Sequence, residues 1–262
     1  MVELAHTHVQ APAPLGRRRG PAHSVPDMNE DFVVVYAVPL AVPENEFEVC
    51  RGALSADELR RAGRFHHEHD RRRWVVARGT LRIILGHHLG ARPEALAFSA
   101  GPHGKPGLAG DHSHSGLEFN LSHSDDLALV ALSNRSPVGI DVEKVRSLDD
   151  FDDLVSRFFS RRETALFLAL PDLEKPAAFF NLWTRKEAWL KATGEGIGRF
   201  LHLVEVSFLP GEPAKLLSIP RHLRSGGGWK LAALEPWRGY AAALAVRSVE
   251  LRMKFEVWTH DV

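Results

Sequence analysis

The chain has 262 residues, enough for one large domain or two small ones, and its 44% hydrophobic and 25% charged residues are typical of a globular protein. Lys plus Arg and Asp plus Glu both total 33, so no overall charge draws the chain to nucleic acid or to an anionic membrane. The single cysteine, Cys50, cannot form an internal disulfide, and no apolar run approaches the ~20 residues that span a bilayer, which together favour a cytoplasmic location.

The first part of the chain predicts an extension followed by a half built of strands and helices. Residues 1–29 are rich in His, Pro, Ala and Arg but lack the apolar stretch of a secretory signal, so we interpret them as a flexible extension. Ser55 with Glu58 is a capping-box pattern that predicts a helix start, and Gly90 ends a second helical pattern. The elements expected over residues 30–136 are strands at 32–38, 95–99, 119–122 and 127–133 and helices at 56–65 and 71–88.

A domain boundary is expected at Ser136-Pro137, a dipeptide that separates two extended runs. We expect residues 249–262 to form a C-terminal tail. The elements expected over residues 137–248 are strands at 138–145, 204–208, 229–234 and 240–246 and helices at 154–168 and 177–193.

The two halves repeat one order of elements. In each, a strand precedes an Arg-Phe pair (Arg64-Phe65 and Arg157-Phe158), and a long helix then ends at a glycine. The repetition predicts an α+β pseudo-dimer of two similar halves with a ligand cleft between them. The alternative is a coincidence of common α+β elements.

Two carboxylates stand in the strand predicted over 138–145. Asp141 and Glu143 are separated by one apolar residue, and strand side chains alternate, so both acids share one face while Ile140 and Val142 point into the core. Like charges side by side repel, and a cation relieves the repulsion. Mg²⁺ typically binds one or two carboxylates together with substrate phosphates and water. The alternative is a half-exposed strand with two solvated acids.

A third acid and two lysines lie on the helix predicted over 177–193. Trp183, Glu187 and Lys191 follow one another at intervals of four, so their side chains lie along one stripe of the helix. Glu187 can complete a metal site or accept a proton, and Lys186 and Lys191 can hold phosphate oxygens. The alternative is an ordinary Glu–Lys pair on a solvated face.

Two short polar motifs precede these elements. Ser122 and His123 lie in the run FNLSHS at the end of a predicted strand, where side chains can offer hydrogen bonds without disturbing a sheet. Lys105 lies before Pro106, which places a cation on a stiff, extended loop. Either motif alone is typical of a polar turn.

Taken in chain order, the motifs resemble those of the 4′-phosphopantetheinyl transferases of the surfactin-synthetase-activating type. The resemblance covers roughly residues 31–246 and implies a pseudo-twofold fold with coenzyme A and Mg²⁺, or Mn²⁺ in its place, between the halves. It also implies transfer of 4′-phosphopantetheine from coenzyme A to a serine of an acyl, peptidyl or aryl carrier protein, with release of adenosine 3′,5′-bisphosphate. The motifs are GKP (104–106), FNLSHS (119–124), GIDVE (139–143), RFFS (157–160) and WTRKEAWLKATGEG (183–196).

The resemblance implies roles by position. The metal-binding acids would be Asp141, Glu143 and Glu187. The catalytic residues would be Glu187, Asp141 and Lys191, and either Glu187 or a metal-bound water would take the serine proton. The residues implied to contact coenzyme A are Arg73, Lys105, Pro106, Ser122, His123, Asp141, Lys186 and Lys191.

Carrier docking and oligomeric state follow from the same resemblance. Carrier proteins of such pathways are usually acidic, so a basic and apolar surface between the last two motifs would attract one. A built-in pseudo-dimer makes a monomer the expected state. The residues considered for docking are Phe158, Phe159, 166–168, Arg157, Arg161 and Arg162.

Three other classes compete with this interpretation. The 15 histidines suggest a zinc protein, but the clusters around residues 66–69, 87–88 and 112–114 have no cysteine partners and no recognised ligand spacing. A non-catalytic homologue that binds coenzyme A or carrier proteins would be marked by the loss of a metal-binding acid, and all three acids are present. A different Mg²⁺-dependent phosphotransferase is disfavoured because the sequence has no Gly-rich phosphate loop of the G-x-x-x-x-G-K-[ST] kind.

Overall fold

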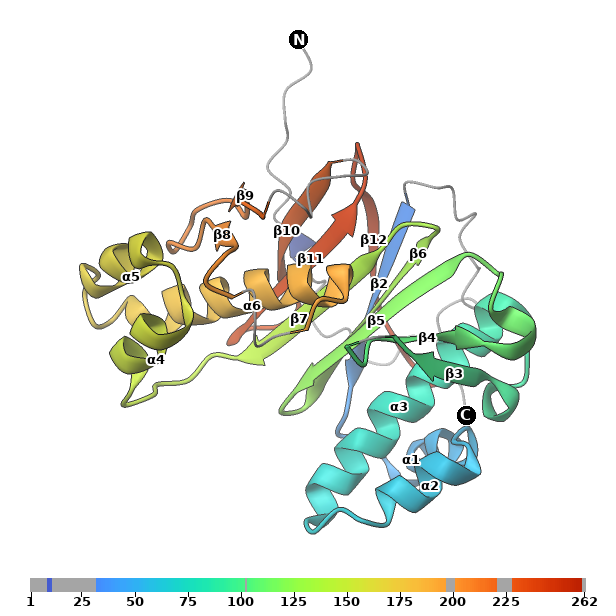
Figure 1. Ribbon diagram of the computed structural model, residues 1–262. Coiled ribbons are helices and arrows are strands. Elements are labelled where there is room, and N and C mark those ends of the chain that lie inside the picture. Colours follow the sequence, from blue (N-terminus) through green and yellow to red (C-terminus); the bar gives the residue numbers. More distant parts are fainter. Residues whose placement is uncertain (1–8, 11–31, 102, 197–200, 221–227, 261–262) are drawn as a thin grey trace.

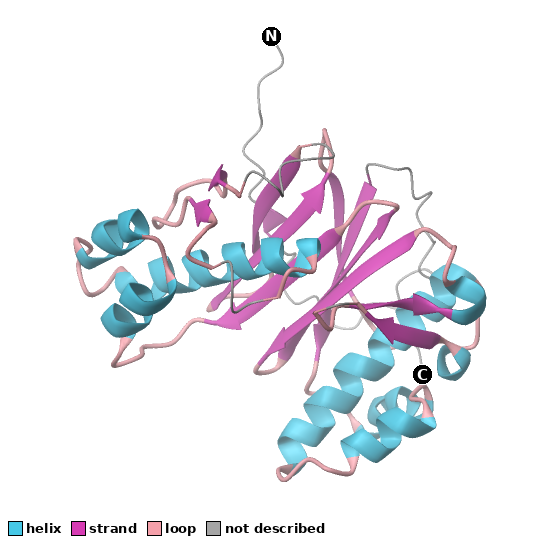
Figure 2. Ribbon diagram, viewed as in Figure 1, coloured by secondary structure: helices cyan, strands magenta, loops and turns pink. Residues whose placement is uncertain are grey.

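The protein is a mixed α+β molecule in which helices cover the outer faces of two four-stranded sheets (Figure 1). The computed structural model describes residues 9–10, 32–101, 103–196, 201–220 and 228–260. Figure 2 shows the helices gathered on two opposite sides with the strands between them. No helix in the described ranges is both long and apolar enough to cross a membrane.

The first sheet has the strand order β12-β2-β6-β5, and its outer face is covered by α1, α2 and α3. The Ser55 side chain accepts the Glu58 N–H, and the Glu58 carboxylate accepts the Ser55 N–H, so the predicted capping box starts α2. Gly90 ends α3 in the left-handed region at φ 62°, as the sequence predicts. The β3–β4 hairpin lies beside β5. The bounds are β2 (Phe32–Pro39), β5 (Leu117–Ser124), β6 (Leu127–Asn134), β12 (Arg252–Val257), α1 (Glu44–Gly52), α2 (Ala56–Ala62), α3 (Glu68–Leu89), β3 (Ala97–Ala100) and β4 (Pro106–Ala109).

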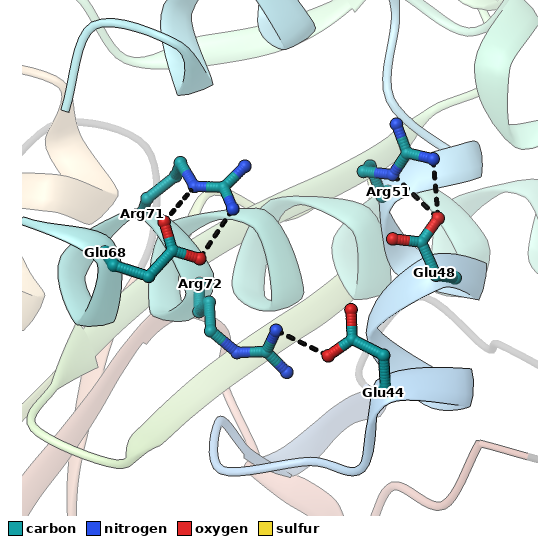
Figure 3. A network of polar contacts seen from close by, with 6 residues as sticks. All are labelled: Glu44, Glu48, Arg51, Glu68, Arg71 and Arg72. Carbon is teal, nitrogen blue, oxygen red and sulfur yellow. Dashed lines mark hydrogen bonds and ion pairs between the residues drawn. The ribbon is translucent and has the colours of Figure 1, made fainter.

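Helix α1 is an element that the sequence did not predict. Its N-cap is Pro43, which makes no side-chain capping bond, so the usual start signal is missing. Its apolar face nevertheless packs closely on α3, because a Cβ on Gly79 would lie only 2.2 Å from the Cys50 carbonyl oxygen. Exposed ion pairs border the contact, including Glu44 with Arg72 at 2.8 Å (Figure 3). Such surface pairs contribute at most about 1 kcal/mol each, so burial and close packing hold α1 in place.

The second sheet has the strand order β1-β10-β11-β7, and α6 lies across its outer face. The helix predicted over 154–168 is instead two helices, because Phe159 is extended and Ser160 begins a new capping box with Glu163. The S-x-x-E pattern was the signal for that break. The bounds are β1 (Val9–Gln10), β7 (Val138–Lys144), β10 (Trp229–Glu235), β11 (Tyr240–Arg247), α4 (Phe151–Phe158), α5 (Arg161–Leu168), α6 (Lys175–Thr193), β8 (Glu205–Val206) and β9 (Leu216–Ser218).

The two sheets pack face to face. On β2, Val33 and Val35 lie in the core between the sheets, while Val34 and Tyr36 lie in the core under α1 and α3. On β7, Ile140 and Val142 also lie between the sheets, as strand alternation predicts. Aliphatic side chains therefore fill the core between the sheets.

The halves share a topology. β2-β6-β5 and β7-β11-β10 follow the same order, and in each half a long helix that ends at a left-handed glycine connects the first strand to a hairpin. The predicted two-half α+β fold is therefore confirmed.

The chain ends differ from the sequence interpretation. Residues 252–257, expected in a C-terminal tail, form β12, which pairs in parallel with β2, and the following Trp258 is buried. The alternating run RMKFEV is the strand signal, and its partner lies at the other end of the sequence. Most of the predicted extension 1–29 lies outside the described residues; Val9–Gln10 pair with β10 as β1.

Candidate functional site

Gly139 brings α6 directly onto β7. A Cβ at this position would lie 2.2 Å from the Ala188 carbonyl oxygen and 2.3 Å from the Ala192 nitrogen, so only glycine permits this approach. The same face of β7 carries Asp141 and Glu143, since side chains alternate along a strand. The end of α6 therefore lies directly over the two acids.

Asp141 is the centre of the site. It is 3% exposed, and its Oδ1 accepts hydrogen bonds from Lys191 Nζ at 2.5 Å and from Ser122 Oγ at 2.8 Å. Its Oδ2 is buried and has no hydrogen-bond partner within the described residues. Burial raises the pKa of Asp141, while Lys191 and Ser122 oppose the rise.

Glu187 and Glu143 stand beside Asp141. Glu187 is 2% exposed, and its Oε1 is likewise buried without a partner in the described part of the chain. Burial, followed by the negative charge of Asp141, raises the pKa of Glu187 to about 7. Glu143 is half-buried and accepts a hydrogen bond from Ser124 Oγ at 2.8 Å; burial, followed by Asp141, raises its pKa as well. The three acids thus form one electrostatic cluster.

The donor set of this cluster fits a hard cation that also binds phosphate. Buried carboxylate oxygens without partners are costly, and a cation satisfies them. Within the described ranges, no group of three or more His, Cys, Asp or Glu side chains is arranged as a cage that could hold a metal ion by itself. Mg²⁺ needs no such cage, because it takes one or two carboxylates and fills its shell with phosphate oxygens and water. Asp141 Oδ2 and Glu187 Oε1 are the oxygens available for it.

Lys105 bridges the strand and the helix that carry the acids. Lys105 Nζ donates to the carbonyl oxygens of Val138 at 3.1 Å and Ala192 at 3.0 Å, and burial lowers its pKa. Pro106 follows it as the first residue of β4. The Lys105 ammonium therefore lies where β7 begins and α6 ends.

Arg73 and His123 lie at the β5–β6 turn. Arg73 on α3 forms ion pairs with Asp125 and Asp126 of this turn. Desolvation lowers the pKa of His123, and the positive charges of Lys191 and Arg73 lower it further. His123 is therefore close enough to both cations to feel their charge.

Comparisons with known proteins agree with this geometry. The family model described as the 4′-phosphopantetheinyl transferase superfamily matches residues 137–245, and the N-terminal model of the same transferases matches residues 42–135. The chain is 43% identical over 225 residues to the 4′-phosphopantetheinyl transferase HetI of a Nostoc species, covering 86% of this chain and 92% of the relative. The chain belongs to the 4′-phosphopantetheinyl transferase superfamily.

More distant relatives carry the same name. The 4′-phosphopantetheinyl transferase Sfp of Bacillus subtilis is 28% identical over 159 residues, covering 61% of this chain and 67% of the relative. The 4′-phosphopantetheinyl transferase AcpT of Salmonella typhimurium is 37% identical over 113 residues, covering 43% of this chain and 56% of the relative. The protein is thus a transferase that moves 4′-phosphopantetheine from coenzyme A to carrier proteins, and enzymes of this superfamily generally depend on a metal ion.

Lys186 lies apart from the rest of the predicted transferase site. It is 0% exposed, and its Nζ donates to Glu163 at 2.5 Å and to the Leu201 carbonyl oxygen at 2.6 Å. Neighbouring residues on a helix point about 100° apart, so Lys186 and Glu187 face different surroundings. The expectation that Lys186 contacts coenzyme A therefore does not fit its position. Its ammonium instead ties α6 to α5, whose capping residue Glu163 also accepts the Val206 N–H at 3.1 Å.

The sequence interpretation of this transferase also missed residues that shape the site. Asn120 and Ser124 alternate with Ser122 on β5 and hydrogen-bond to β7, and Ser124 reaches Glu143. A polar residue at every second position of an otherwise apolar strand was the available signal. Glu163 was visible as the last residue of an S-x-x-E capping box.

Proposed function

We propose that this transferase is Mg²⁺-dependent, with Mn²⁺ as a substitute, and that Asp141, Glu143 and Glu187 hold the ion. The observation that carries the proposal is the pair of buried oxygens without partners, Asp141 Oδ2 and Glu187 Oε1. A cation bound there would offset the burial that raises the pKa values of all three acids, and also the negative charge of Asp141 that adds to the rise at Glu143 and Glu187. When bound, the ion would neutralise charge on the pyrophosphate of coenzyme A.

Glu187 is our candidate for the general base. A general base needs an acceptor atom free to take the proton, and Glu187 Oε1 is buried without a hydrogen-bond partner in the described part of the chain. The serine oxygen of the carrier would attack the pantetheine-side phosphorus, the bond from that phosphorus to the oxygen of adenosine 3′,5′-bisphosphate would break, and Glu187 would take the serine proton. In the alternative route, Glu187 would take this proton through a water held by the ion rather than directly. Positioning and charge neutralisation supply most of the catalysis in such transfers.

Lys191 would hold a phosphate oxygen from the end of α6. The Lys191 side chain is 24% exposed, whereas Lys186 is fully buried. The Lys191 ammonium donates hydrogen bonds to Asp141 and Ser122 and so lies beside the acid cluster. Charge-assisted bonds of this kind orient phosphate groups. We propose that the remaining contacts to coenzyme A come from Arg73, Lys105, Pro106, Ser122 and His123.

Residues 30–136 and 137–248 are proposed as the two halves, with the coenzyme A cleft between them. The polar row of β5 and the acids of β7 come from different halves, which supports a site at their junction. A pseudo-dimer within one chain supports a monomeric enzyme, and the buried free thiol of Cys50 is compatible with the cytoplasmic location expected from the sequence.

The partner is proposed to be an acyl, peptidyl or aryl carrier protein with an acidic surface. Leu166 and Leu168 are 44% and 46% exposed on α5, close in sequence to the exposed Arg161 and Arg162. Phe159 and Phe167, by contrast, are buried in the core under α6, so they are not part of the proposed docking surface. An exposed apolar and basic surface fits an acidic partner.

Intact-mass spectrometry of an apo carrier protein tests the proposed function. Incubation with the enzyme, coenzyme A and Mg²⁺ should add one phosphopantetheinyl group to the carrier. The gain should disappear with EDTA, return with Mg²⁺ or Mn²⁺, and disappear with Glu187→Ala. The matched control is Glu94→Ala, which removes an exposed glutamate of the other half and should leave the gain intact. A gain that survives both EDTA and Glu187→Ala would overturn the metal site.

A further inference from the structure

The two sheets meet at two strands that share no backbone ladder. β7 is the last strand of its sheet and pairs with β11, and β5 is the last strand of the other sheet and pairs with β6. Among the described strands, no backbone pairing joins β5 to β7, although they lie in close contact. The outer edge of β7 would therefore present N–H groups that need other acceptors.

Three side chains of β5 supply these acceptors. Asn120 Oδ1 accepts from the Ile140 N–H at 2.8 Å, Ser122 Oγ from the Val142 N–H at 3.4 Å, and Ser124 Oγ from the Lys144 N–H at 3.1 Å. Asn120, Ser122 and Ser124, which we call the polar seam, occupy every second position of β5. The seam thus replaces a backbone ladder with side chains and sets the register of β7 against the other half.

Two members of the polar seam also contact the acids of β7. Ser122 Oγ donates to Asp141 Oδ1 at 2.8 Å, and Ser124 Oγ donates to Glu143 Oε2 at 2.8 Å. A hydroxyl can donate only one hydrogen bond. When its oxygen also accepts an N–H, the direction in which it donates is restricted. Ser124 therefore holds Glu143 Oε2 toward β5 while its own oxygen is held by Lys144. Asn120 makes no hydrogen bond to a carboxylate among the described residues, so it serves as an internal comparison.

We propose that Ser124 is a positioning residue for Glu143, and that the two serines of the polar seam, Ser122 and Ser124, present the acids of β7 in the arrangement that binds the metal ion. The inference rests on the proposed metal role of Glu143. Hydrogen bonds to metal ligands orient them, and their loss typically lowers metal affinity by about 10–100-fold. Without Ser124 Oγ, the half-buried Glu143 carboxylate is free to rotate toward solvent, and the ion loses an oriented ligand.

Mn²⁺ binding to the full-length enzyme, followed by electron paramagnetic resonance without coenzyme A or carrier, tests the inference directly. Ser124→Ala should weaken Mn²⁺ binding by about 10-fold. Ser124→Thr, which keeps a hydroxyl, should restore most of it. In a Glu143→Ala background, Ser124→Ala should have no further effect, because the residue it positions is gone.

The variant Asn120→Ala distinguishes the positioning of Glu143 from a general contribution of the seam to stability. It removes the acceptor of the Ile140 N–H and should lower the midpoint of thermal unfolding, but it should leave Mn²⁺ affinity within about twofold of the wild type. If Ser124→Ala and Asn120→Ala weaken Mn²⁺ binding equally, the positioning role of Ser124 is wrong and the seam acts only through stability.

The remaining outcomes distinguish the inference from the proposed function on which it rests. If Glu143→Ala weakens Mn²⁺ binding and Ser124→Ala does not, the inference fails while the metal site stands. If Glu143→Ala and Glu187→Ala both leave Mn²⁺ binding unchanged, the proposed metal site fails and the inference fails with it.

Discussion

The two halves of the molecule use one architecture for different purposes. β2 and β7 are the first strands of the shared orders β2-β6-β5 and β7-β11-β10, and each turns one row of side chains toward a long helix. In β2 this row includes Val34 and Tyr36, which pack into an apolar core. In β7 it includes Asp141 and Glu143. Exchanging one apolar row for an acidic one converts a packing surface into a reactive site.

This exchange costs the second half stability. Burial leaves Asp141 Oδ2 and Glu187 Oε1 without partners in the described structure, and it raises the pKa values of all three acids. Among its described residues, the first half has no such cluster under its long helix, where Tyr36 meets His88 and Trp258 instead. Strained electrostatics are common at functional sites and are supported by well-packed surroundings.

The largest expected effect is the loss of transfer when the acidic row is neutralised. Asp141→Asn keeps the shape of the side chain but removes the charge that the ion and Lys191 need. We expect kcat/KM to fall by about 10³-fold, equivalent to about 4 kcal/mol of transition-state stabilisation. Steady-state phosphopantetheinylation of an apo carrier measures it, and circular dichroism checks that the variant is folded. A fall of less than tenfold would contradict the role of Asp141.

The second prediction concerns the pH dependence of stability. The pKa of Glu187 rises from 4.5 to about 7 on folding, so between these pH values the folded state binds more protons than the unfolded state. The contribution of Glu187 to the free energy of unfolding should therefore be greatest below pH 4.5. It should fall by about 3 kcal/mol in the metal-free enzyme as the pH rises from 4.5 through 7.

Glu187→Gln isolates this contribution from the other acids. Urea unfolding with EDTA at pH 5 and pH 8 should show a smaller loss of stability in the variant than in the wild type. At pH 8 the variant should be the more stable of the two. Identical pH dependence in both proteins would show that Glu187 is not desolvated as described.

The third prediction compares the two close helix contacts. Gly79→Ala and Gly139→Ala each place a Cβ 2.2 Å from a backbone oxygen, so each should lower the free energy of unfolding by about 1–3 kcal/mol. Gly139→Ala also pushes α6 off β7 and displaces Glu187, and a displacement of about 1 Å can lower the rate by about 10²-fold. Gly79→Ala should keep the activity of the folded fraction. Equal loss of activity in both would break the comparison between the halves.

The smallest expected effect is that of Tyr36→Phe in the apolar row of β2. The change removes the hydrogen bond between the Tyr36 hydroxyl and His88 Nε2 at 3.1 Å and leaves the ring in place. The free energy of unfolding should fall by about 1 kcal/mol, and kcat/KM should not change. Thermal unfolding and transfer assays on the same preparation measure both. A change in kcat/KM would show that the first half contributes to the site through this core.

Local patterns in the sequence determined much of this protein. Apolar, β-branched runs predicted strands in both halves, the pair Ser55 and Glu58 predicted a helix start, and glycines marked the ends of both long helices. Asp141 and Glu143 could be placed on one strand face because the period of a strand is two. These signals depend on neighbours in the sequence, so a single chain suffices to find them.

Only the tertiary structure decided which of these residues meet. Lys186 and Lys191 lie in one motif, but packing buries the first against Glu163 and brings the second to Asp141. Residues 252–257 became a strand because β2, far away in the sequence, offered an edge. Contacts between distant segments depend on how the elements pack, and no local period encodes them. The polar seam is such a contact: its residues are polar in the sequence, and only the missing ladder between β5 and β7 gives them their partners.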